Sequence, residues 1–153
     1  HLAACLATIG NTGKTGRVSA AIACNAIMDL TDPKWLPYAA CSCTQTQAIK
    51  HTAACVSPLY HIKPGIVPML VMHGLADDCV FPSHSIRFSE KMKQCHNRCD
   101  LVLFPNTGHA FIIAGYTATD QQIAAAMRTA DAFLVSLGFF DGRPGKEEGG
   151  NKH

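Results

Sequence analysis

The sequence predicts an α/β fold, in which a mostly parallel sheet carries helices on both of its faces. Short apolar runs of strand length alternate along the chain with segments of helical pattern, and this alternation is typical of parallel sheets. Hydrophobic residues make up 48% of the 153 residues and charged residues 16%, so the chain can bury a core. The 13 Lys and Arg and the 11 Asp and Glu are not clustered by sign. We therefore expect no nucleic-acid partner.

The first half of the chain contains one predicted strand and a long connection. Residues 1–9 are rich in Ala and Leu and are followed by Gly10, which predicts a short buried helix. The apolar run 18–28 has turn-rich flanks and is typical of a strand buried on both faces, although its composition also suits a helix. Residues 31–63 contain three prolines and the only Trp. We interpret them as an excursion with one helix near 45–54.

Two further strands and a helix are predicted in the second half. The apolar run 68–72 ends at a His-Gly pair, and the apolar run 101–104 ends at a Pro-Asn pair. Between the two strands, Ser83 can cap a helix that continues to about residue 96. This strand–helix–strand order predicts that the two strands are parallel neighbours.

The clearest helix begins after Thr119, which forms a capping-box sequence with Gln122. One face of this helix is apolar and consists of Ile123, Met127, Ala130, Phe133, Leu134 and Leu137. The domain is expected to cover residues 1–140, and the polar, Gly-rich residues 141–153 are expected to form a flexible tail. No apolar run approaches the roughly 18 residues that a membrane span requires.

Eight cysteines bear on metal binding and on location. Neither Cys41 and Cys43 nor Cys95 and Cys99 have the C-x2-C spacing of a zinc site, so we expect no metal. Several cysteines lie in polar stretches, where one or two disulfides could form. The cysteine content is compatible with a secreted or extracytoplasmic protein, and it does not exclude a cytoplasmic one.

Ionisable residues follow both of the later strands. Asp77 and Asp78 come after the run 68–72, and His109 comes after the run 101–104. The carboxyl ends of neighbouring parallel strands meet at one edge of a sheet, so an acid and this histidine are expected within reach of each other. Such a pair supplies the acid and the base of a nucleophile–His–acid triad. Alternatively, the histidine is an ordinary loop residue and the aspartates cap the turn.

Three motifs lie between Ser57 and Phe111. They read Ser-Pro-Leu at 57–59, His-Gly-x-x-Asp-x-x-Val at 73–80 and Pro-x-x-Gly-His-x-Phe at 105–111. This stretch resembles the C-terminal half of α/β-hydrolase esterases, and is most similar to acetyl esterases and to the acetyl-xylan and feruloyl esterase-like group. The resemblance implies the C-terminal part of an α/β-hydrolase fold. It also implies that Asp77 is the triad acid, with Asp78 as the alternative, and that His109 is the catalytic histidine.

The same resemblance bears on the nucleophile. In these esterases the nucleophile elbow reads G-x-S-A-G-G followed by His-Leu-Ala, and this chain opens with His-Leu-Ala at 1–3. The nucleophilic serine is thus expected four residues before His1, in an N-terminal half of the same domain, together with the oxyanion hole. None of the serines present has the flanking glycines that the strained elbow turn requires; they are Ser19, Ser42, Ser57, Ser83, Ser85, Ser89 and Ser136.

The resemblance implies a serine hydrolase that acts on carboxylic esters of short or carbohydrate-linked acyl groups, without a metal or cofactor. The excursion 31–63 would form a substrate-side wall that contains Trp35 and Tyr38. Simple packing explains Trp35 and Tyr38 equally well. Phe111, two residues beyond His109, is a further candidate for substrate contact, although a residue in this position more often packs beneath the loop.

Three alternatives to an esterase remain open. A serine peptidase of the prolyl-oligopeptidase type shares the His-Gly-x-x-Asp-x-x-Val and Gly-His features. A dienelactone-hydrolase-type enzyme would use a Cys nucleophile upstream. Finally, the 153 residues alone could be an inert fragment or an interaction module, because the strand at 18–28 would expose an apolar edge without a neighbour. We expect the isolated chain to be inactive.

Overall fold

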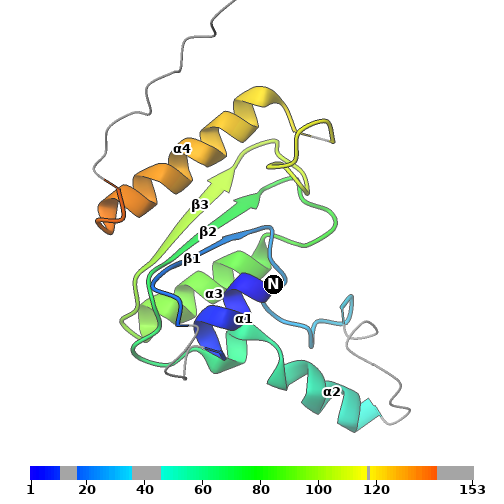
Figure 1. Ribbon diagram of the computed structural model, residues 1–153. Helices are drawn as coiled ribbons and strands as arrows, with labels where there is room; N and C mark the ends of the chain where they lie inside the picture. The colour runs from blue at the N-terminus through cyan, green and yellow to red at the C-terminus, as the bar shows by residue number, and fades with distance from the viewer. Residues whose placement is uncertain (11–16, 36–45, 117, 141–153) are drawn as a thin grey trace, which may run out of the picture.

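The computed structural model describes residues 1–10, 17–35, 46–116 and 118–140. Its elements in chain order are α1 (Leu2–Thr8), β1 (Ala21–Cys24), α2 (Thr46–Cys55), the 3-10 helix η2 (Pro58–His61), β2 (Met69–Gly74), α3 (Ser83–Gln94), β3 (Cys99–Phe104) and α4 (Asp120–Ser136) (Figure 1). Within the described ranges, no helix has the length and apolarity that crossing a membrane requires.

The strands form a parallel sheet in the order β1-β2-β3. Ala21 of β1 is in register with Met69 of β2, and Met69 is in register with Cys99 of β3. Because all three strands run in the same direction, their carboxyl ends lie at one edge of the sheet (Figure 1). The predicted parallel α/β fold is therefore confirmed.

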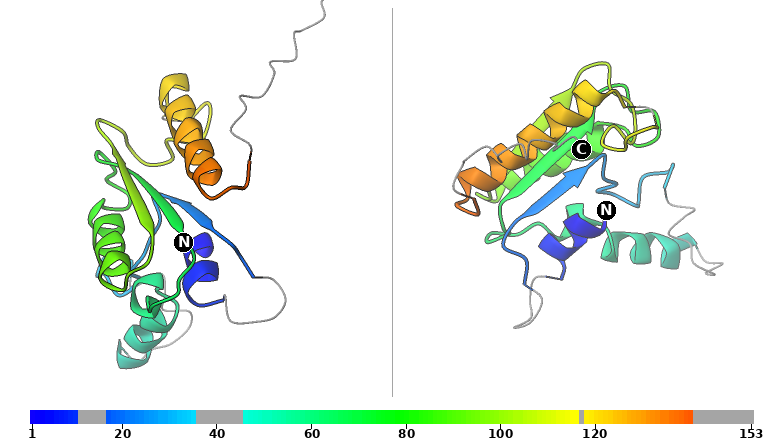
Figure 2. Two further views of the ribbon diagram at one scale, coloured as in Figure 1. Left: turned by 90° about the vertical axis from the view of Figure 1, so that its left-hand side faces the viewer. Right: turned by 45° about the horizontal axis from the view of Figure 1, so that its top comes forward.

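Helices cover both faces of this sheet. Helices α1 and α3 lie on one face and α4 lies on the other (Figure 2). The side chains of the central strand β2 alternate between the two layers, as the pleat requires. Met69 and Val71 pack with α1 and α3, whereas Leu70 and Met72 pack with Phe133 of α4. Every residue of β2 is buried, because it has a neighbouring strand on each side and helices above and below.

The first strand and the first helix differ from the prediction. Strand β1 covers only Ala21–Cys24, not 18–28, because the next residue, Asn25, leaves the extended conformation with φ 45°. Burial in β1 alternates between buried and half-buried residues, so the strand is not fully buried on both faces. Helix α1 is only partly buried, since Leu2 and Leu6 are 77% and 53% exposed.

The later elements agree more closely with the prediction. Strand β2 runs two residues further than predicted, through His73 and Gly74. The capping box at Thr119 is present, but Met127, assigned to the apolar face of α4, is 54% exposed. Ser83 is the first residue of α3 and not its cap, because Pro82 holds the cap position.

Six of the eight cysteines lie in the described ranges, and all six are free thiols. No disulfide therefore forms among these six, while Cys41 and Cys43 lie outside the described residues. Burial in the sheet raises the pKa of Cys24 to about 11 and that of Cys99 to about 12. These two thiols consequently stay protonated near neutral pH.

Candidate active site

The loop that follows β2 places the Asp77 carboxylate at the carboxyl edge of the sheet. The backbone N–H groups of Cys79 and Val80 both donate to Oδ1 at 2.9 Å. The Asp77 side chain is completely buried. Because both donors come from the residues immediately after the aspartate, the turn itself fixes the carboxylate and leaves Oδ2 for other partners.

His109, in the loop after β3, meets that second oxygen. Its Nδ1 lies 2.8 Å from Asp77 Oδ2, and its side chain is 38% exposed while that of Asp77 is 0% exposed. A carboxylate can only accept, so the proton of the neutral imidazole lies on Nδ1 and its basic lone pair is on Nε2. This is the arrangement by which a triad acid orients its histidine.

A second histidine contacts Asp77 from the interior. His73 Nε2 lies 2.8 Å from the Val80 carbonyl oxygen and 3.2 Å from Asp77 Oδ2. A carbonyl oxygen only accepts, so Nε2 carries the proton, and Nδ1 accepts from the Ser85 hydroxyl at 2.6 Å. Burial lowers the pKa of His73 despite the nearby carboxylate, which keeps the ring neutral.

The chain Ser85–His73–Asp77 has the composition of a catalytic triad but is enclosed. Both Ser85 and His73 are 0% exposed, so no substrate can reach the Ser85 hydroxyl. We conclude that this buried chain supports the Asp77 carboxylate from behind, while the half-exposed His109 is on its accessible side.

The loop after β2, which carries Asp77, is called the acid loop, and the loop after β3 is called the His109 loop. Their backbones touch at Gly74, the last residue of β2. A Cβ atom added to Gly74 would lie 2.2 Å from the Thr107 carbonyl oxygen and 2.7 Å from that of Gly108. The Ala76 N–H donates to the same Thr107 oxygen at 2.9 Å. Only glycine permits this approach, and the approach brings Asp77 within hydrogen-bond distance of His109.

The alternative acid, Asp78, lies outside this arrangement. Its side chain is exposed, and its backbone carbonyl oxygen accepts from the Lys34 ammonium. The Lys34 Nζ also lies 4.5 Å from the ring centroid of Phe81. The structure thus pairs His109 with Asp77, and Lys34 attaches the segment after β1 to the acid loop.

The aromatic candidates have different positions. Trp35 is half-buried, and Lys34 Nζ lies 6.0 Å from its ring centroid, while Tyr38 lies outside the described residues. Phe111 is 1% exposed, and its ring centroid is 5.0 Å from that of Phe104 in the core beneath α4. These contacts are those of a residue that packs in the core, which was the alternative to substrate contact for Phe111.

Asp29, an acidic residue in the segment after β1, is not part of the Asp77–His109 pair and has other partners. The Thr31 hydroxyl and N–H donate to its Oδ1 at 2.6 and 2.9 Å, and Arg87 donates to Oδ2 at 3.2 Å. Burial acts to raise the pKa of Asp29, but the Thr31 hydrogen bonds and the Arg87 charge outweigh it and lower the pKa. Asp29 therefore links the segment after β1 to α3.

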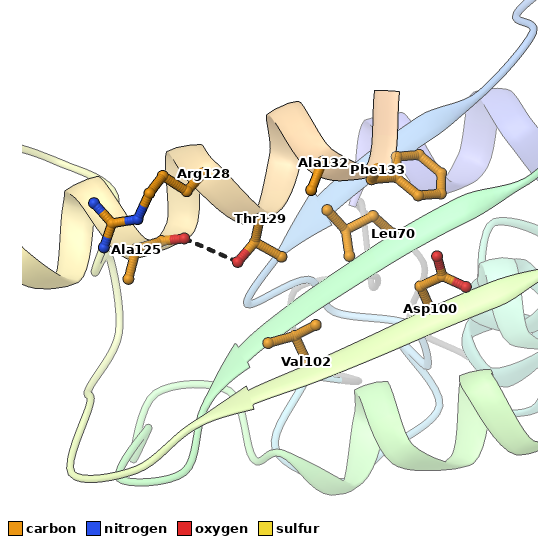
Figure 3. Close-up of a pocket in the computed structure, with 8 residues that line it drawn as sticks. All are labelled: Leu70, Asp100, Val102, Ala125, Arg128, Thr129, Ala132 and Phe133. Atoms are coloured by element: carbon orange, nitrogen blue, oxygen red, sulfur yellow. Dashed lines mark hydrogen bonds between the residues drawn. The ribbon is translucent and has the colours of Figure 1, made fainter. Parts of the chain in front are cut away.

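A groove of about 540 Å³ lies elsewhere, between α4 and the sheet (Figure 3). Leu70 and Asp100, the second residues of β2 and β3, line it together with Arg128 of α4. The groove thus opens near the amino ends of the strands, whereas Asp77 and His109 follow their carboxyl ends. We do not assign it to the same site.

Sequence reasoning missed the contributions of Asn25, Gly74 and Ser85. Asn25 bonds to both loops of the site, Gly74 permits their contact, and Ser85 anchors His73. The His-Gly pair could have suggested a close approach after a strand. No local signal marks Asn25, since its partners are far away in the sequence.

The fold and the Asp77–His109 pair define the α/β-hydrolase class. Residues 7–137 match the prolyl oligopeptidase family. The match covers most of the chain, so the chain belongs to this family. No curated protein matches the sequence significantly.

Solved structures similar to this chain include esterases from the Planctomycetes species Thermogutta terrifontis. The butyrate-bound esterase Est2 has a TM-score of 0.74 at 28% identity, and the alignment covers 94% of this chain and 55% of that one. Esterase 2 phosphoramylated by tabun has a TM-score of 0.72 at 30% identity, with 94% and 53% covered. Esterase 2 phosphorylated by paraoxon has a TM-score of 0.71 at 30% identity, and the alignment covers 94% of this chain and 52% of that one. The chain thus spans about half the length of these relatives.

Proposed function

We propose that this chain is the C-terminal part of a serine hydrolase domain that cleaves carboxylic esters. The observation that carries the proposal is the hydrogen bond between His109 Nδ1 and the buried Asp77 carboxylate, at 2.8 Å. Because Asp77 holds the proton on Nδ1, the Nε2 lone pair can act as a general base. The alignment to esterases over 94% of the chain supports the same function.

The nucleophile in this proposal is a serine that precedes His1. The resemblance of residues 1–3 to the residues after a nucleophile elbow supports this placement. Three of the described serines are engaged elsewhere: the Ser57 hydroxyl donates to the Ala53 carbonyl at 2.6 Å, that of Ser136 donates to the Phe133 carbonyl at 2.6 Å, and Ser85 is enclosed. None of them lies in the glycine-flanked turn that exposes a nucleophilic Oγ.

The reaction then follows the order of acyl transfer. The serine Oγ attacks the ester carbonyl carbon while its proton moves to His109 Nε2, and the imidazolium is stabilised by Asp77. The carbon–oxygen bond to the alcohol breaks as His109 returns the proton to the leaving oxygen. Water then attacks the acyl-enzyme and gives a proton to His109, and the serine leaves with that proton.

Esters of short acyl groups are the proposed substrates. Structures of the similar esterase Est2 carry propionate and butyrate, which supports a short acyl group. An acetyl or carbohydrate-linked acyl ester, as in acetyl-xylan and feruloyl esterases, is the narrower proposal. Peptide hydrolysis is the second candidate, because the family match is to prolyl oligopeptidases.

The test uses the full-length protein and two substrates. We expect turnover of p-nitrophenyl acetate and butyrate, little turnover of a dipeptidyl p-nitroanilide, and loss of ester turnover in His109→Ala. Faster cleavage of the anilide would establish the peptidase instead. Unchanged ester turnover in His109→Ala would contradict both functions.

Paraoxon labelling locates the nucleophile. Esterase 2 of Thermogutta terrifontis is phosphorylated by paraoxon, and we expect mass spectrometry to find the diethylphosphoryl group on a serine that precedes His1. A label on a serine or cysteine within residues 1–153 would overturn the proposed position of the nucleophile.

A further inference from the structure

Asn25 lies where the ends of all three strands come together. Its backbone N–H donates to the Met72 carbonyl at 2.9 Å, which extends the pairing of β1 and β2 by one residue. Its own φ is 45°, in the left-handed region that asparagine tolerates better than most residues. The residue is 7% exposed, so its side-chain amide requires internal partners.

The amide has one partner in each loop of the site. Oδ1 accepts from the Gly74 N–H at 3.0 Å, and Nδ2 donates to the Gly108 carbonyl at 3.3 Å. The first partner is a donor and the second is an acceptor, so the orientation of the amide is fixed by its surroundings. A carboxylate of the same shape lacks the donor, and an aliphatic side chain lacks both groups.

These two bonds act next to the site. Gly108 directly precedes His109, and Gly74 opens the turn that holds Asp77. Gly74 has no side chain to separate the two loops, and the backbones of Gly74 and Thr107 come close enough that a Cβ would collide. The side chain of Asn25 therefore holds together two backbones whose separation determines the distance from Asp77 to His109.

We propose that Asn25 is a positioning residue, whose amide sets the His109 imidazole against the Asp77 carboxylate. The proposal rests on the proposed function for its effect on turnover, but its structural part concerns only the Asp77–His109 hydrogen bond. Displacement of a catalytic group by about 1 Å can cost up to roughly 100-fold in rate. A partial displacement of the His109 loop is expected to cost about tenfold.

The test compares two glycine variants of the full-length protein. Asn25→Gly removes both side-chain hydrogen bonds while glycine accepts the positive φ, so backbone strain does not confuse the result. His96→Gly is the matched control, because His96 is exposed, has φ 57° and lies at the end of α3. We expect Asn25→Gly to lower kcat about tenfold with KM within about twofold, and His96→Gly to change neither.

A proton NMR signal provides the readout that does not depend on activity. The His109 Nδ1–H that donates to Asp77 is expected as a low-field resonance in the unmodified protein and in His96→Gly. In Asn25→Gly we expect this resonance to broaden or move upfield while circular dichroism remains unchanged. A general loss of stability would change the circular dichroism melting curve and leave the resonance of the folded protein in place.

Asn25→Asp separates the two hydrogen bonds. It keeps an acceptor for the Gly74 N–H but places a carboxylate oxygen against the Gly108 carbonyl, so we expect a loss of kcat at least as large as in Asn25→Gly. If either Asn25 variant had the same low-field resonance and the same kcat as the protein that carries Asn25, the inference would be overturned. If His109→Ala retains turnover, the proposed function fails separately, and the resonance still decides the role of Asn25.

Discussion

At the scale of single residues, two adjacent aspartates occupy very different environments. The carboxylate of Asp77 is buried and receives hydrogen bonds from two backbone N–H groups and from His109. Asp78 is exposed at the surface of the same turn. The chemical difference between the two residues therefore arises only from the conformation of the loop after β2.

This difference can be tested with two matched substitutions in the full-length protein. Asp77→Asn preserves size but presents an amide to His109, so we expect kcat/KM for p-nitrophenyl butyrate to fall on the order of 10³–10⁴-fold. Asp78→Asn is expected to change kcat/KM by less than about twofold. Steady-state kinetics provide the measurement. A larger loss in Asp78→Asn than in Asp77→Asn would make Asp78 the acid.

Two buried histidines predict how stability depends on pH. Burial lowers the pKa values of His73 and His84. His84 Nδ1 accepts from the N–H groups of Met28 and Asp29, both at 3.3 Å, so a proton on this nitrogen would displace two hydrogen bonds. The folded state therefore binds fewer protons than the unfolded state once the pH falls below about 6.5.

The expected result is a loss of stability on the acid side of neutrality. The free energy of unfolding should be constant above about pH 7 and should decline below about pH 6.5, by up to about 1.4 kcal/mol per pH unit for each histidine. Urea unfolding at a series of pH values measures this slope. We expect His84→Asn, whose amide oxygen can accept in place of Nδ1, to reduce the slope. An unchanged slope would exclude His84 as a source.

At the scale of elements, the contact between the acid loop and the His109 loop is the critical one. The backbones of two loops that follow different strands can touch because Gly74 has no side chain to hold them apart. Gln122, in the first turn of α4, adds a further link, since its Nε2 donates to the Thr107 hydroxyl at 3.0 Å. The capping box of α4 is thus connected to the loop that carries His109.

Gly74→Ala tests this contact. A Cβ at 2.2 Å from the Thr107 oxygen must separate the loops, so we expect kcat to fall more than tenfold and stability to fall by roughly 1–3 kcal/mol. Gly10→Ala is the control, because its Cβ would meet Leu6 at an ordinary 3.5 Å. Kinetics and urea unfolding provide the measurements. Full activity in Gly74→Ala would show that the loops need not touch.

At the scale of the whole molecule, the outer side of strand β1 has no neighbouring strand in the part of the chain that the structure describes. Among the described residues β1 pairs only with β2. Near its start, Val18 and Ala20 line an apolar groove together with Leu134, Phe139 and Phe140. The two phenylalanines are 48% and 59% exposed. An apolar strand edge beside an apolar groove is prone to associate with another chain.

We therefore expect a polypeptide limited to residues 1–153 to associate or precipitate, and to be inactive on p-nitrophenyl acetate. Light scattering coupled to size-exclusion chromatography measures the association. Co-expression with a segment that contains the G-x-S-A-G-G elbow is expected to restore solubility and turnover. A monomer of residues 1–153 whose turnover is abolished by His109→Ala would show that the nucleophile lies within these residues.

Much of the fold could be predicted from local patterns. Apolar runs of strand length, the capping box at Thr119 and the prolines of the excursion are properties of a few adjacent residues, and the predicted order of elements is confirmed. The errors occurred where local composition is ambiguous. The apolar run 18–28 gave no sign that the strand would end at Cys24, since the positive φ of Asn25 depends on partners in other loops.

The sequence alone determined the parallel α/β arrangement and placed an acid and a histidine after neighbouring strands, because strand ends and turn residues are local features. The motif resemblance already favoured Asp77 over Asp78, and the tertiary structure shows the Asp77 carboxylate hydrogen-bonded to His109. Only the tertiary structure revealed that Asn25, Gly74 and Ser85 support the pair. The side chain of Asn25 forms hydrogen bonds with Gly74, which is 49 positions further along the sequence, and with Gly108, which is 83 positions further along. Such contacts depend on how the sheet brings its strand ends together, and no short stretch of sequence contains that information.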